Sequence, residues 1–308
     1  MRHPASARLW AGISFADTQQ ENHLSYLDIQ GAGSEGQYVH IQRSNVTLDH
    51  AHFSGAEHIV IDVADSSLIL RNSVVEGIGK HEVIHGRRTP VGGHFLVESN
   101  TFYPNVGYND IVDLNDCKSP GAIPQFVGNI FLGGGDDGLD IDRSEAYVEG
   151  NIFVNFKLNG HKRVSHAISA GAESRLTVTN NLFVCNEHAI LSRKGAYVRL
   201  LNNTFYGTRF GAVCFNEHQN KPGGASIENC IFWENNASFL YDDQATELVV
   251  KNSVLPEAAR WCDQGNLDVD PKFEDAPNGN FHLQQDSLAL GRGASIDPAR
   301  FPRVPLNR

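Results

Sequence analysis

A four-residue block that ends in a large apolar side chain recurs along the chain. It is Gly-Asn-Ile-Phe at 128–131 and at 150–153, Asn-Asn-Leu-Phe at 180–183 and Asn-Asn-Thr-Phe at 202–205, with weaker copies on both sides. Its last residue falls at positions 29, 53, 75, 102, 131, 153, 183, 205, 232 and 255, so a spacing of 22 recurs and insertions lengthen the other repeats. A repeat of this length predicts a solenoid, in which each turn contacts only its neighbours.

Apolar and polar residues alternate between the copies of the block, as in Leu-Thr-Val at 176–178 and Val-Arg-Leu at 198–200. A period of two indicates short strands with one buried face, and Asn or Gly at the corners tolerates the left-handed backbone that sharp turns need. We therefore predict an all-β fold, a single-stranded right-handed parallel β-helix of about ten coils of 22–30 residues. The alternatives are a β-propeller, whose blades need about 40 residues, and a β-sandwich, which keeps no fixed repeat.

The two ends of this stack differ in sequence. Residues 266–273, 279–283 and 286–290 resemble the closing segment of many secreted bacterial β-helix proteins, so we predict a C-terminal cap at 264–308 on a β-helix of residues 1–263. A cap is expected because an open last turn would pair with strands of other chains. Residues 10–15 already alternate like a strand inside a coil, so we expect the β-helix to lack its natural N-terminal part and any export signal there.

Composition narrows the class of partner. The formal net charge of −11 argues against nucleic acid, which needs a basic surface. The chain has no run of about 18 apolar residues, so we expect no membrane insertion. Its five cysteines form no CxxC pair, which argues against a zinc knuckle or a redox motif. We expect a monomer that is secreted or held at the cell surface.

Acidic residues gather on one predicted strand face. In the stretch 110–115 the side chains of Val112 and Leu114 should point inward, and the same alternation recurs one coil later at 137–142. The outward positions are then Asp113, Asn115, Asp140 and Asp142, with Arg193 two coils on and with Asp110, Asp136 and Asp137 at the strand starts, near His166 and His188. Carboxylates about 5 Å apart repel one another, which favours either Ca²⁺, held by Asp113, Asp140 and Asp142, or a raised pKa that makes a general acid. The alternative is a set of solvated corner residues.

Insertions on both sides of this strand face predict a groove. The insertion at 155–164 should overhang the acidic strands, and the loops on the other side lengthen after the strand. Loops raised beside a strand face commonly carry function. A groove with an acidic floor and basic walls suits an anionic or polyhydroxyl chain, and its predicted substrate-binding residues are Lys157, His161, Lys162, Arg163, Arg87 and Arg88.

The overall pattern resembles the pectate lyase and polygalacturonase superfamily of β-helices. One ordered set of motifs is similar to that of polygalacturonases, namely Asn109-Asp110, Gly135-Asp136-Asp137, His166 with its neighbours, and Arg193-Lys194. The resemblance implies inverting hydrolysis with Asp110, Asp136, Asp137, His166, Arg193 and Lys194 as catalytic residues. The same residues also fit a lyase, in which Ca²⁺ on Asp113, Asp140 and Asp142 neutralises a uronate and a Lys or Arg takes the C5 proton.

The stretch 134–206 more closely resembles secreted bacterial β-helix proteins whose activity is not established. Two functions therefore stay open. The first is an extracellular enzyme that cleaves an acidic, uronate-containing polysaccharide, as a glycoside hydrolase or a polysaccharide lyase, with Ca²⁺ as the cofactor that the acids suggest. The second is a non-catalytic surface or adhesive solenoid, or one that only binds carbohydrate.

Overall fold

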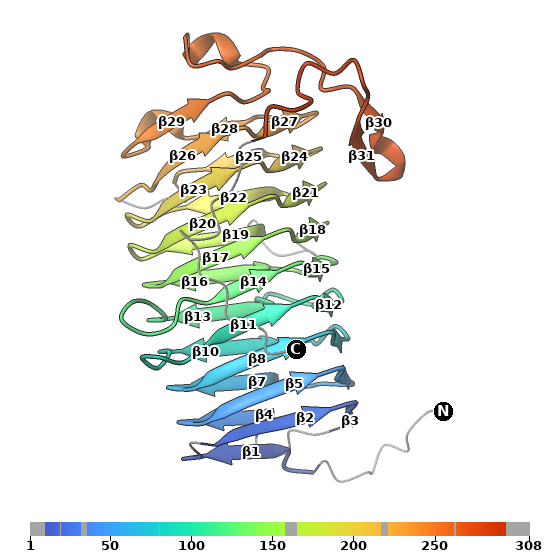
Figure 1. Cartoon of the computed structure of the whole chain (residues 1–308), viewed down its shortest axis with the longest axis vertical. Helices are drawn as coiled ribbons and strands as arrows, with labels where there is room; N and C mark the ends of the chain where they lie inside the picture. Colours follow the sequence, from blue (N-terminus) through green and yellow to red (C-terminus); the bar gives the residue numbers. More distant parts are fainter. Residues whose placement is uncertain are drawn as a thin grey trace.

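The computed structural model describes residues 10–18, 20–31, 36–79, 81–157, 165–216, 221–261 and 263–293. Within these ranges the chain winds into a stack of turns bounded by three parallel sheets (Figure 1). Nine turns give one strand to each sheet, and a tenth turn gives β28 and β29. The predicted β-helix is therefore confirmed, with nine complete coils where about ten were expected. None of the helices within the described ranges is long and apolar enough to cross a membrane.

The strands of each sheet follow one another at intervals of one turn. The first sheet contains β1 (Ile13–Ala16), β4 (Gln37–Gln42), β7 (Ile59–Ala64), β10 (Ile84–Arg87), β13 (Val112–Asn115), β16 (Leu139–Asp142), β19 (His166–Gly171), β22 (His188–Ser192), β25 (Gly211–Cys214) and β28 (Phe239–Leu240). The second contains β2 (Glu21–Ser25), β5 (Asn45–Asp49), β8 (Ser67–Arg71), β11 (Phe95–Glu98), β14 (Gln125–Val127), β17 (Glu145–Glu149), β20 (Arg175–Thr179), β23 (Tyr197–Leu201), β26 (Gly224–Glu228) and β29 (Leu248–Lys251). The third contains β3 (Asp28–Gln30), β6 (His52–Ser54), β9 (Val74–Val75), β12 (Thr101–Phe102), β15 (Ile130–Phe131), β18 (Ile152–Val154), β21 (Leu182–Val184), β24 (Thr204–Tyr206) and β27 (Ile231–Trp233). The remaining elements are the short 3-10 helices η1 (Asp242–Gln244), η2 (Ala258–Trp261) and η3 (Ala276–Asn278) and the antiparallel pair β30 (Phe273–Asp275) and β31 (Asn280–Leu283).

Each position of the recurring block has one structural role. Its first residue turns the corner with a left-handed backbone, with φ of 63° at Gly128, 65° at Gly150 and 56° at Asn180. Its second residue is a buried Asn, and its fourth is an inward Phe. A left-handed corner costs least with Gly or Asn, which explains why one of these two residue types occupies the first position in most copies.

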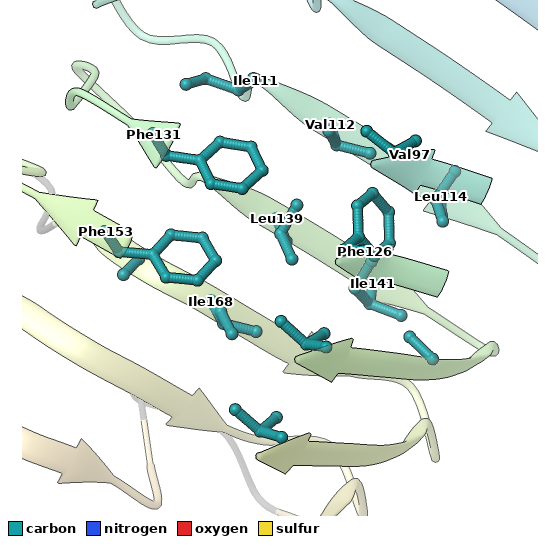
Figure 2. Close-up of a cluster of buried hydrophobic side chains, with 14 of the residues drawn as sticks. Val97, Ile111, Val112, Leu114, Phe126, Phe131, Leu139, Ile141, Phe153 and Ile168 are labelled. Carbon is teal, nitrogen blue, oxygen red and sulfur yellow. The ribbon is translucent and has the colours of Figure 1, made fainter. Parts of the chain in front are cut away.

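The inward Phe residues form a continuous stack through the core. Phe102, Phe131, Phe153, Phe183, Phe205 and Phe232 lie on successive turns, with ring centroids 4.7–5.1 Å apart and planes within 12° of parallel. Figure 2 shows Phe131 and Phe153 in this stack, beside Val112, Leu139 and Ile141 of the first sheet. All of these side chains are fully buried. The stack sets the register of the turns, because a slip of one residue would turn each Phe outward.

The buried Asn residues form a second ladder, at Asn100, Asn129, Asn151, Asn181 and Asn203. From Asn100 to Asn181, the side-chain amide donates to the Oδ1 atom of the next Asn at 2.9–3.0 Å, and the backbone amide donates to the same oxygen at 2.8–3.0 Å. Buried polar groups need such partners, so the ladder satisfies the corners where the strands of the second and third sheets meet.

The C-terminal residues occupy two places. Asn266 and Leu267 extend the ladder past the last turn, since the backbone amides of Ser253 and Leu255 donate to Asn266 Oδ1 and to the Leu267 carbonyl, both at 2.9 Å. The β30–β31 hairpin instead stands beside the third sheet (Figure 1). Trp261 of η2 packs edge-on against Phe239 at 5.3 Å. The predicted division at 263/264, and a cap formed by 264–308, stay predictions; residues 294–308 lie outside the described ranges.

Candidate functional site

The outward face of the first sheet carries a polar row. His40, Asp62, His85, Asp113, Asp140 and Ser169 face one another on six consecutive strands, from β4 to β19. A second row, two residues further along each strand, contains Arg87, Asn115, Asp142 and Gly171. The predicted proximity of Asp113 and Asp140, and of Asn115 and Asp142, is confirmed by this register. It follows from the alternation, because Val112, Leu114, Leu139 and Ile141 all point into the core.

An acid cluster lies at the start of these strands, formed by Asp110, Asp136 and Asp137. One carboxylate oxygen from each of the three lies within 4.8 Å of those of the other two. Gly135 permits the approach, since a Cβ atom there would lie 1.9 Å from the carbonyl oxygen of Gly107 on the preceding turn. The backbone amide of Asp137 donates to Asp110 Oδ1 at 3.1 Å. Burial, and then the charges of Asp137, Asp140 and Asp136, raise the pKa of Asp110 well above its ordinary value.

His166 fixes one acid of this cluster. Its Nδ1 atom lies 2.8 Å from Asp137 Oδ1, which also accepts the His166 backbone amide at 3.0 Å. Both residues are buried, and the His166 ring stacks on that of His188 at 5.4 Å. His188 donates from Nδ1 to the Gly211 carbonyl at 2.9 Å, and burial lowers its pKa to about 4. A neutral His188 places no buried positive charge of its own beside His166.

The acids along the strand have strongly raised pKa values. Burial raises the pKa of Asp113 to about 6, with a contribution from the charge of Asp140. Burial and the charge of Asp137 raise the pKa of Asp140 to about 7, although Arg193 opposes the rise. The side chain of Asp140 is 21% exposed, so it is still reachable from solvent. Two acids on adjacent turns can therefore gain or lose a proton near neutral pH.

Arg193 joins this acidic strand face. Its guanidinium lies 3.6 Å from Asp140 Oδ1 and donates to Ser169 Oγ at 3.2 Å. The buried Oδ1 atoms of Asp140 and Asp142 have no hydrogen-bond partner among the residues that the structure describes. Unpartnered carboxylate oxygens side by side are the kind of ligand that a hard cation takes. Among the described residues, the acids whose ligand atoms gather within 4.8 Å of one another are Asp110, Asp136 and Asp137. Ca²⁺ binding by Asp113, Asp140 and Asp142 therefore stays a prediction.

Gly171 leaves the space that Asp142 occupies. A Cβ atom at this position would lie 2.3 Å from Asp142 Oδ1 and 3.7 Å from the guanidinium carbon of Arg193. On the enzymatic function predicted from the sequence, Gly171→Ala should displace the Asp142 carboxylate and lower kcat/KM on a polysaccharide substrate by about tenfold, as small misplacements in active sites do. The fold should persist because the clash involves the end of a side chain.

Gly79→Ala is the matched control for this variant, since nothing lies within 4 Å of a Cβ atom at position 79. Kinetics and circular dichroism of both variants check the expectation. Equal activity of Gly171→Ala and the parent protein would contradict it.

The remaining predicted residues are dispersed. Lys194 turns the corner after Arg193 with φ of 51°, one residue beyond the strand face. Lys157 is exposed, and its backbone amide donates to the Gly134 carbonyl at 3.2 Å, near the acid cluster. His161, Lys162 and Arg163 lie outside the described residues. Arg87 stands in the second outward row, beside Asn115.

Arg88 is already paired with an acid. Its Nε and terminal nitrogen donate to the two carboxylate oxygens of Asp65 at 2.7 and 2.8 Å. We therefore expect Arg88→Ala to change kcat/KM by less than about twofold, because the Arg88 guanidinium is already bound by Asp65. The fold should persist, since an exposed ion pair contributes little to stability. Arg193→Ala, by contrast, removes the cation beside Asp140 and should lower kcat/KM by more than Arg88→Ala does. Kinetics of the two variants side by side test this ranking, and a larger loss in Arg88→Ala would restore Arg88 as a substrate-binding residue.

Two groups near this face were not predicted from the sequence. The carboxylate of Asp62 is buried between two imidazoles, with His40 Nδ1 at 2.9 Å and His85 Nδ1 at 2.8 Å. Burial opposes ionisation, but the hydrogen bond with His85 and the surrounding positive charges lower the pKa of Asp62. Arg143 donates to both Asn115 and Asp116, at 2.9 Å each. The signal for the first group was the repeat itself, because His40, Asp62 and His85 follow at intervals of 22 and 23 residues.

Comparison with known proteins supports the fold. Residues 112–258 match the family model described as a right handed beta helix region. A search of curated proteins finds no match. Among solved structures, the chain is similar to the catalytic domain of a GH87 alpha-1,3-glucanase in complex with tetrasaccharides, with a TM-score of 0.51, 12% identity, and coverage of 82% of this chain and 59% of that one.

A second similar structure is the catalytic unit of a GH87 alpha-1,3-glucanase from Streptomyces thermodiastaticus strain HF3-3, with a TM-score of 0.42, 14% identity, and coverage of 83% of this chain and 63% of that one. The chain thus spans less than two thirds of either glucanase structure. At such low identity the first similarity concerns the fold alone. The chain is a right-handed parallel β-helix protein.

Proposed function

We propose that the chain cleaves glycosidic bonds of a polysaccharide, as a glycoside hydrolase, at the acid cluster and the acids of the polar row. The observation that carries this proposal is the set of closely packed carboxylates, several of which have raised pKa values. Asp110, Asp113 and Asp140 all have raised pKa values, while Asp137 lies against His166. Glycoside hydrolysis needs one protonated and one ionised carboxyl group at the same bond.

We propose a role for each group. Asp110, whose pKa is raised well above its ordinary value, donates its proton to the leaving glycosidic oxygen. Asp137, which His166 orients, accepts a proton from the attacking water. Asp136 helps to position this water. The negative charge of these acids stabilises the positive charge that develops on the sugar ring. Arg193 binds the substrate and keeps Asp140 in place through their 3.6 Å contact.

The finer identity of the substrate is part of the proposal. Arg87 and Arg193 border the acids on the same sheet face, and such cations would bind the carboxylate of a uronate unit. An acidic polysaccharide is therefore the substrate that we propose, and a location outside the cell follows from such a substrate. The alpha-1,3-glucanase neighbour supports cleavage of a glycan and makes a neutral glucan the first comparison substrate.

A Ca²⁺-dependent lyase is the second candidate, and the unpartnered oxygens of Asp140 and Asp142 favour it. Asp113, Asp140 and Asp142 would hold the ion, which when bound neutralises the uronate carboxylate and acidifies the C5 proton. In this chemistry a Lys or Arg would take that proton, and Arg193 lies 3.6 Å from Asp140 Oδ1. A non-catalytic carbohydrate-binding solenoid is the third outcome.

One screen separates the three. The protein is incubated with acidic and neutral polysaccharides, including α-1,3-glucan, in Ca²⁺ and in EDTA. New reducing ends without ultraviolet absorbance, formed also in EDTA, support the hydrolase. Absorbance from unsaturated ends that appears only with Ca²⁺ supports the lyase. Retention of the protein on an immobilised polysaccharide without any product would leave the binding solenoid and overturn both enzymatic functions.

A further inference from the structure

A hollow of about 460 Å³ lies between the third sheet and the C-terminal hairpin. Figure 1 shows β30 and β31 standing beside this sheet, whereas the acids occupy strands of the first sheet. The sheet contributes Tyr206 and Trp233, which face each other on β24 and β27. The hairpin contributes Phe273 and the residues around it. The volume is within the range of about 300–1,000 Å³ that is typical of small-molecule sites.

The aromatic wall of the hollow is rigid. The Tyr206 ring packs edge-on against Phe281 at 5.1 Å and against Phe273 at 6.4 Å. Its hydroxyl donates to Glu234 Oε2 at 2.6 Å, and this hydrogen bond, with burial, raises the pKa of Tyr206 to about 12. Aromatic residues fixed in this way keep an open binding surface without losing entropy when a ligand arrives.

Trp233 is the accessible part of that wall. Its side chain is half-buried and points outward from β27. The indole N–H makes no hydrogen bond within the part of the chain that the structure describes. An indole that lines a hollow with an unused donor is suited to a ligand with both C–H faces and hydroxyl groups.

The polar rim of the hollow is acidic. Glu234, Asp270, Glu274 and Asp275 all line it. The one lysine of the rim, Lys272, is paired with Asp286. The surplus of negative charge disfavours an anionic ligand. Carboxylates are acceptors with about four lone-pair positions each, so they can bind several hydroxyl groups of one neutral sugar.

We propose that this hollow binds a hexose unit of a neutral glycan, stacked on Trp233 and hydrogen-bonded to Glu234 and the hairpin carboxylates. The site is independent of the proposed catalytic face, since it lies on another sheet and is made from different residues. It would hold the protein on a neutral glycan while the first sheet acts on its own substrate.

Titration calorimetry of the whole chain tests this site, with α-1,3-gluco-oligosaccharides and cello-oligosaccharides as neutral probes and galacturonate oligomers as acidic ones. The protein should carry Asp110→Asn and Asp137→Asn, so that no probe is cleaved. We expect at least one neutral series to bind, and Trp233→Ala to weaken it by about tenfold or more, as removal of an aromatic anchor does. Tyr26→Ala is the matched control, because Tyr26 is an 80% exposed aromatic residue near the opposite end of the stack.

A second variant separates loss of binding from loss of structure. Asp270→Asn combined with Glu274→Gln alters two exposed rim residues and should also weaken the neutral probe, without a change in Tm. The proposal is overturned if no neutral probe binds, if Trp233→Ala binds as the parent protein does, or if tetramethylammonium displaces the bound sugar and binds more tightly. Acidic oligomers that still bind after Trp233→Ala would belong to the first sheet, so the two proposals fail separately.

Discussion

Replacing Asp110 and Asp137 together with Asn is expected to lower kcat/KM on a cleaved polysaccharide by about 10³-fold or more, because general acid and general base catalysis each contribute about 10²- to 10⁴-fold. Asn at 110 has no proton of carboxylic acidity to donate, and Asn at 137 cannot accept one from water. The fold should persist, since an amide oxygen at 137 can still accept the backbone amide of His166, as the carboxylate does at 3.0 Å. Neutralising two crowded carboxylates also removes repulsion within the cluster.

Asp65→Asn is the control for this double variant. Asp65 is an acid at the corner after β7, paired with Arg88 and outside the acid cluster. Its replacement should leave kcat/KM unchanged. Initial rates of product formation and thermal unfolding, measured on the three proteins, test the assignment. A double variant that keeps a tenth or more of the parent activity would remove both residues from catalysis.

The fold could be predicted because every position of the repeated block has a single physical task. The Gly or Asn at the corner, the buried Asn and the inward Phe each satisfy one requirement, and each requirement repeats with the turn. The lateral position of the hairpin could not be predicted in this way. It depends on the contact of Phe281 with Tyr206, a residue well before the last turn, and no local pattern encodes that contact.

The site was predictable where residues of the same chemical type occupy the same position in adjacent repeats. Asp113 and Asp140 are acids at the same place in adjacent repeats, so register alone brought them together. Asp62 occupies the same row, but its neighbours are His40 and His85, and no run of acids marked it. The 3.6 Å approach of Arg193 to Asp140 depends on the side chain reaching past Ser169, which spacing along the chain cannot specify.

Compared with the parent protein, a variant carrying Asp113→Asn and Asp140→Asn is expected to gain unfolding free energy as pH rises from about 4 to about 8. The folded-state pKa values of these acids are raised, from 3.8 to about 6 and to about 7. A raised carboxylate pKa means that the folded state binds more protons than the unfolded state. The stability that such a group contributes is fully present below the pKa of the unfolded state, and it is lost as the pH rises to the pKa of the folded state. For Asp140 the rise corresponds to roughly 2 to 4 kcal/mol, after allowance for the screening of a partly exposed group.

The difference between the two proteins isolates this effect from other titrating groups. His188, with its pKa lowered to about 4, makes the folded state gain stability between about pH 4 and the ordinary histidine value, and it does so in both proteins. Urea unfolding of parent and variant at several pH values, in EDTA so that no cation screens the acids, yields the difference directly. Asp268→Asn, at an exposed acid beyond the last turn, is the control. If the difference in unfolding free energy between parent and variant stays constant across this pH range, Asp113 and Asp140 ionise in the folded protein as freely as in water. These two carboxylates could then not transfer protons near neutral pH.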